Sequence, residues 1–173
     1  MKVAWGCGIV AALGLALCTA EAGEKAPPSP VQQQANAKLL QAAQEGNAAS
    51  VTTALAEGAE VNCRGAKGLT PLLQVLSGPT GTTNGNRRDC VALLLKNGAE
   101  VNATDAQGRT PLIYAVQAGD LETVRLLVDA GAFITLRDRS HKTALLHAAE
   151  GGQRQILIYL GQTLKTQQKQ SAW

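Results

Sequence analysis

Apolar residues in the second half of the chain recur at the spacing of short amphipathic helices. A polar stretch ends at Thr110, and an apolar run then begins at Pro111 and stops at Gly119. A second run, with apolar positions three and four residues apart, ends at Gly131. Such spacing indicates one buried helix face, so the pattern predicts two short helices in succession. The residues expected on the buried face are Leu112, Ala115, Val124, Leu126 and Leu127.

This helix-pair pattern returns along the chain at a regular distance. The segment Asp105-Ala-Gln-Gly-Arg-Thr-Pro-Leu112 reappears 33 residues later as Asp138-Arg-Ser-His-Lys-Thr-Ala-Leu145. A third copy, Gly68-Leu-Thr-Pro-Leu72, precedes the first by 40 residues. Self-similarity at a period of this length indicates a stack of small similar units.

Residues at fixed places in the repeat are suited to structural roles. Thr110 can cap the first helix through its hydroxyl, and Pro111 occupies the first helical position, where a missing N–H costs nothing. Ala115 must be small so that neighbouring helices can approach closely. Asn62 and Asn102 follow the second helix of their repeats, where we expect them to hydrogen-bond nearby backbone groups and hold the turn.

One repeat unit and two hairpin signatures carry a resemblance to the ankyrin-repeat family. The unit contains Gly108-Arg-Thr-Pro-Leu112, and the signatures are Gly58-Ala-Glu-Val-Asn62 and Gly98-Ala-Glu-Val-Asn102. The resemblance implies an all-α solenoid of about four helix-turn-helix repeats joined by β-hairpin loops. We expect a repeat domain over residues 31–162, whose units span 36–64, 65–104, 105–137 and 138–162.

The repeats depart from the family pattern in two ways. The position after Thr-Pro-Leu, usually histidine in that family, holds Leu73, Ile113 and Leu146, so apolar packing must replace a hydrogen-bond network. The second repeat is seven residues longer, which predicts an extra loop near residues 77–86 between its helices. Loop insertions cost little free energy. The alternative is a partner-contacting finger, because insertions in repeat proteins tend to fall on the binding face.

The N-terminus is typical of a secretory signal peptide over residues 1–22. A positive start and a short apolar run lead to the small-residue pattern Ala20-Glu-Ala22. A Pro-rich tether follows over residues 23–30, and the first helix can open at its end, at Ser29-Pro30. A polar tail of residues 163–173, expected to fray, ends the chain. The sequence thus predicts a periplasmic or secreted protein. The alternative is a membrane-anchored lipoprotein through Cys18.

Two cysteines, Cys63 and Cys90, remain after the leader. In the repeat register Cys63 falls in a hairpin and Cys90 near the start of a second helix, which places them about a helix length apart, roughly 15 Å. A disulfide needs Cα atoms within about 7 Å. We therefore expect two buried thiols rather than a bridge.

Candidate chemistry is sparse in the mature chain. Its two histidines are His141, which replaces the turn glycine, and His147. Neither has a cysteine, a carboxylate or a second histidine at the spacing of a metal site. No nucleophile elbow or phosphate-binding loop accompanies them. The sequence therefore predicts a non-enzymatic protein with no catalytic residue, no metal and no cofactor.

Basic residues gather at the hairpin positions of the repeats. Domains similar to ankyrin repeats generally bind partners through the hairpin tips and the adjacent concave face, which makes these residues candidates for partner binding. A basic surface would steer an acidic partner; the plainer interpretation is that these charges only keep exposed turns soluble. The candidates are Arg64, Lys67, Arg109, Arg137, Arg139 and Lys142.

The resemblance implies a monomeric, non-catalytic module that binds a protein partner in the bacterial envelope, with a role in envelope or oxidative-stress defence. We expect no nucleic-acid binding, because aromatic residues are only 3% of the chain and none accompanies the basic positions. A membrane is expected as a partner only if Cys18 is lipidated. Two alternatives stay open: a binder of an anionic envelope polymer or membrane surface, and an immunity protein that neutralises a secreted toxin.

Overall fold

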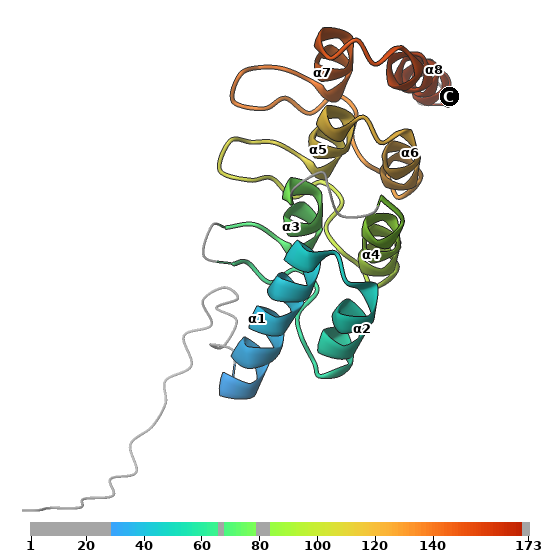
Figure 1. Ribbon diagram of the computed structural model, residues 1–173. Helices are drawn as coiled ribbons and strands as arrows, with labels where there is room; N and C mark the ends of the chain where they lie inside the picture. The colour runs from blue at the N-terminus through green and yellow to red at the C-terminus, as the bar shows by residue number, and fades with distance from the viewer. Residues whose placement is uncertain (1–28, 66–67, 79–83, 171–173) are drawn as a thin grey trace, which may run out of the picture.

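The computed structural model describes residues 29–65, 68–78 and 84–170, and these residues form eight helices. Consecutive helices pair, and the pairs stack so that the odd-numbered helices form one row and the even-numbered helices a second (Figure 1). Hairpin loops project beside the first row (Figure 1). The all-α solenoid of four helix pairs is confirmed. The helices are α1 (Pro30–Glu45), α2 (Ala48–Ala56), α3 (Pro71–Ser77), α4 (Asn84–Lys96), α5 (Pro111–Ala118), α6 (Leu121–Asp129), α7 (Ala144–Glu150) and α8 (Arg154–Gln170).

Threonine caps start the first helix of three repeats, as the sequence predicts. The hydroxyl oxygens of Thr70, Thr110 and Thr143 accept hydrogen bonds from backbone amides three residues later, at 3.3–3.4 Å. These bonds satisfy amides that have no partner within the helix. Gly119 ends α5 in the left-handed conformation, with φ of 71°.

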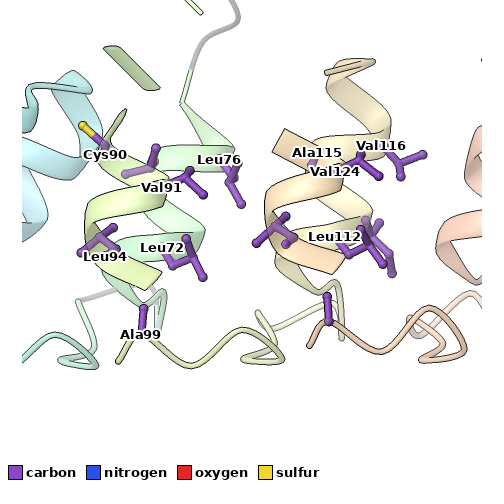
Figure 2. Close-up of a cluster of buried hydrophobic side chains, with 14 of the residues drawn as sticks. Leu72, Leu76, Cys90, Val91, Leu94, Ala99, Leu112, Ala115, Val116 and Val124 are labelled. Carbon is purple, nitrogen blue, oxygen red and sulfur yellow. The ribbon is translucent and has the colours of Figure 1, made fainter. Parts of the chain in front are cut away.

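The core is a continuous apolar layer between successive helix pairs. Leu72, Leu112 and Val124 are each at most 1% exposed, and Figure 2 shows them on facing helices. Ala115 is fully buried, which confirms that this position must be small. Leu126 is only half-buried, so the prediction that it lies on the buried face was wrong. It is followed by Leu127, which takes the inward position instead.

The insertion in the second repeat lengthens a helix as well as a loop. Helix α4 begins at Asn84 and has 13 residues, whereas α2 and α6 have nine each. The prediction of loop up to residue 86 was therefore wrong for its last three residues. The buried Arg87 side chain donates to the Gly78 carbonyl at 2.9 Å and ties the added turn to the end of α3. Residues 79–83 lie outside the described part of the chain.

Both ends of the repeat domain extend beyond the expected limits. Helix α1 begins at Pro30 with Ser29 as its cap, which confirms the helix start expected there. Helix α8 continues to Gln170, so residues 163–170 are helical and the expectation of a frayed tail was wrong for them. The reason is apolar contact, since Leu164 packs against the core.

Several sequence predictions concern residues outside the structural description. These are the signal peptide, the tether up to residue 28, Cys18 and Lys67. Among the described segments, no helix is long and apolar enough to cross a membrane.

Candidate functional site

A buried aspartate organises the hairpin before α5. One carboxylate oxygen of Asp105 accepts from the backbone amides of Gln107 and Arg109, each at 2.8 Å. The other oxygen accepts from the Tyr114 hydroxyl at 2.8 Å. Burial alone raises the pKa of Asp105, but these bonds and the Arg109 side chain outweigh burial and lower the pKa overall. Asp105 is therefore an ionised support for the hairpin.

The next hairpin repeats this arrangement 33 residues later with a different partner. Asp138 accepts from the amides of Ser140 and Lys142 at 2.8 and 3.0 Å. Its second oxygen lies 2.8 Å from Nε2 of His147, which occupies the position of Tyr114. Burial again raises the pKa of Asp138, and the same kind of hydrogen bonds lowers it overall. His147 thus supports a hairpin, and the repeat register is the signal that predicts its partner.

Three of the six candidate basic residues have partners inside the fold. Arg109 lies 2.8 Å from the Asp105 carboxylate, and its guanidinium sits 4.6 Å from the ring centre of Tyr114. Lys142 lies 2.6 Å from the Glu150 carboxylate. Arg64 donates to the carbonyl of Gly68 at 3.2 Å, within its own hairpin. The local charges at Arg109 and Lys142 are therefore largely compensated.

Two of the candidates present free charge. Arg137 and Arg139 are exposed in the hairpin before α7, and neither guanidinium has an ion pair with any residue that the structure describes. Their backbone is fixed: Arg137 forms a β-bridge with Thr143, and the Arg139 amide donates to Gln107 of the preceding hairpin at 2.9 Å. The structure therefore concentrates free positive charge in the fourth repeat rather than along the whole stack.

Two asparagines connect neighbouring repeats, a role that differs from the local one expected from sequence. The Asn62 side chain donates to the Gly98 carbonyl at 3.1 Å and accepts from the Glu100 amide at 2.8 Å. Asn102 bonds in the same way to residues 131 and 133 of the next repeat. The prediction of turn-local bonds was wrong because the equivalent turn of the adjacent repeat comes within reach only after stacking.

Both cysteines of the repeat domain are free and buried, as expected. Cys63 is 7% exposed and Cys90 is fully enclosed. Burial, with the negative charge of Glu60 as a lesser cause, raises the pKa of Cys63 to about 11. Burial also raises the pKa of Cys90. Both thiols are therefore protonated at neutral pH and are poor nucleophiles.

A polar groove of about 380 Å³ lies where the turns of the second and third helix pairs meet. Its main charges neutralise each other: Arg88 lies 3.3 Å from Asp120, and Asp120 also accepts from Thr123 at 2.8 Å. Asp120 caps α6. The groove is therefore occupied by interactions that hold helices. Among the described residues no group of His, Cys, Asp and Glu side chains is arranged to hold a metal ion.

The comparison with known families agrees with this architecture. A family model described as ankyrin repeats (3 copies) matches residues 39–138 and 80–170, which is most of the chain. The chain therefore belongs to the ankyrin-repeat family. Ankyrin repeats are protein-interaction modules, which is the class of protein that the stack and its hairpins define. No curated protein matches the sequence.

Proposed function

We propose that this chain is an exported, non-catalytic binding module that docks an acidic protein partner on the hairpin before α7. The supporting observation is the pair Arg137 and Arg139, whose exposed guanidinium groups have no intramolecular ion pair within the described segments. A charge that already has a partner contributes little to an interface, whereas a free arginine on a rigid hairpin can form a bidentate bond with a carboxylate.

Charge reversal of both arginines tests this proposal. The double variant Arg137→Glu/Arg139→Glu should lose capture of the protein partner from envelope extract and keep its thermal unfolding curve, because neither side chain packs in the core. The readout is quantitative pull-down at several salt concentrations, since a surface-charge contact weakens as salt rises. The control is Arg154→Glu, which makes the same charge change at an exposed position at the start of α8.

Two results would contradict the proposal. Unchanged capture by the double variant would exclude the two arginines as the docking site. Retention on an anionic polymer or on anionic liposomes that disappears at moderate salt, with no protein captured, would favour the polymer or membrane surface as the ligand instead.

Export has a separate test. If residues 1–22 are a signal peptide, the protein recovered from the producing cell begins at Gly23, which intact mass and N-terminal sequencing measure directly. A chain that begins at Cys18 and carries added lipid mass would instead establish the lipoprotein alternative. Recovery of the chain with Met1 retained would contradict both.

A further inference from the structure

The outer face of the last helix pair keeps the apolar residues that bind a following repeat. In the third repeat, Leu112 and Ile113 are each 1% exposed, because α7 and α8 pack over them. The residues 33 positions later are Leu145, which is half-buried, and Leu146, which is 44% exposed. The described residues place no further helix pair on this face.

These side chains line a groove of about 340 Å³. Its floor consists of Leu145, Leu146 and Ala149 of α7, and Leu157 of α8 forms one side. Val116 and Val124 are the equivalents of Ala149 and Leu157 one repeat earlier, and both are fully buried. The groove therefore has the residue arrangement that receives a helix in the preceding repeat.

The two ends of the stack differ in polarity. Terminal repeats of solenoid proteins normally need a polar outer face for solubility. At the other end, α1 follows this rule and exposes Gln34, Lys38 and Gln41. Leu146 breaks the rule at the α7 end. An exposed apolar surface of this kind, bordered by polar residues, marks an interaction site.

The charge around the groove selects the partner. Arg137 and His141 line its hairpin side, and the exposed Arg137 side chain has no ion pair among the described residues. The neighbouring carboxylates are already engaged: Glu150 by Lys142 at 2.6 Å, and Asp138 by His147 at 2.8 Å. A second copy of the chain would bring a second Arg137 to the same rim, where like charges repel. The surface therefore favours a partner with carboxylates beside an apolar stripe.

We propose that this end face docks an acidic amphipathic helix of a partner protein, in the place where the first helix of a following repeat would pack. Helix-in-groove recognition reads apolar residues at positions i, i+3, i+4 and i+7. Carboxylates on the flank of that helix would face Arg137. This surface is distinct from the hairpin tip at Arg139, so the inference goes beyond the proposed function.

Two synthetic helical peptides of roughly 18 residues, about five turns, test the inference. They share one leucine face and differ only in a polar face of glutamates or of lysines. In titrations of the purified protein followed by fluorescence anisotropy, the glutamate peptide should bind at least about tenfold more tightly than the lysine peptide. Leu146→Glu should weaken that binding by about tenfold or more, and Arg137→Glu should reverse the preference between the two peptides.

Matched controls separate this face from the rest of the molecule. Ile158→Glu changes a residue that is 52% exposed on α8 outside the groove, and it should leave peptide affinity unchanged. Arg139→Glu should also retain peptide binding, which distinguishes the end face from the hairpin site. Far-ultraviolet circular dichroism and thermal unfolding establish that each variant is folded.

Several outcomes would overturn the inference. One is the absence of binding, or equal binding of both peptides. Another is a protein dimer in sedimentation that Leu146→Glu dissociates, since the face would then be covered by a second copy. A third is a change in the Leu146 amide resonance on truncation after Gln170, which would assign the groove to the chain's own C-terminal residues.

Discussion

Asp105 and Asp138 hold two hairpins with the same set of atoms. Each carboxylate accepts two backbone amides on one oxygen and one aromatic side chain on the other. Tyr114 and His147 are interchangeable in this role because each can donate one hydrogen bond at the same place. The hairpins are thus rigid platforms, and their exposed side chains project from a fixed backbone.

Replacing Asp138 by asparagine tests this support at the level of a single charge. Asp138 has a lowered pKa in the folded protein, so its contribution to stability is complete above the unfolded pKa near 4 and is lost as pH falls through the folded value. Asp138→Asn should lower the free energy of unfolding at pH 7 by about 1–3 kcal/mol. The difference from the unmodified protein should shrink as the pH falls below about 4.

Urea unfolding at a series of pH values measures this effect. Asp129→Asn is the matched control, because Asp129 is exposed at the end of α6 and should give a nearly pH-independent change of small size. A destabilisation by Asp138→Asn that stays constant from pH 7 to pH 3 would show that the ionised carboxylate is not the stabilising species.

Among the elements, the hairpin before α7 has an unusual turn residue. His141 has a φ of 59°, in the left-handed region, where the equivalent residue one repeat earlier is Gly108 with a φ of 72°. A residue with a Cβ pays roughly 1–2 kcal/mol in this region, and glycine pays part of that back as lost backbone entropy. The hairpin therefore carries local strain at His141.

Substituting glycine should relieve this strain. His141→Gly should raise the free energy of unfolding by up to about 1 kcal/mol, measured by urea denaturation. The reciprocal variant Gly108→Ala should destabilise the protein, because its new Cβ would lie 3.3 Å from the Arg139 amide nitrogen in addition to the positive φ. Equal stabilities of the two variants would contradict a left-handed requirement at this position.

The elements differ in how far the sequence could predict them. The Thr110 cap and the Gly119 helix end depend on residues within one turn, so the local sequence contains the whole interaction. The start of α4 depends on Arg87 reaching back to Gly78, and the length of α8 on the contact of Leu164 with the core. Such contacts exist only after the helices have packed.

The same reason limits prediction of the candidate site. The repeat register placed Arg137 and Arg139 on an exposed hairpin correctly. It did not reveal that Lys142 is engaged by Glu150, because that partner comes from the end of α7. Nor did it reveal the groove at Leu146, because the periodic pattern is identical in repeats with and without a neighbour. Exposure, which only the stack determines, separates Leu146 from Ile113.

For the molecule as a whole, the stack encloses its two thiols between helices. Cys63 and Cys90 should react slowly with a disulfide reagent such as DTNB at pH 8 in the native protein, since the thiols are buried and their pKa values are raised. In denaturant both should react at the rate of a free thiol. Absorbance at successive times gives the two rates, and rapid labelling of the native protein would contradict the burial of the thiols.

The asparagine connections give this protein two mechanically different edges. Asn62 and Asn102 fasten adjacent repeats where the hairpins meet the second helices, and each uses both a donor and an acceptor. Since each repeat of a solenoid contacts mainly its neighbours, a bending load passes from one unit to the next in series. We expect the fastened edge to act as the hinge line and the opposite edge, at the helix-helix turns, to open and close. Bending would then change the curvature of the stack while the hairpins keep their spacing.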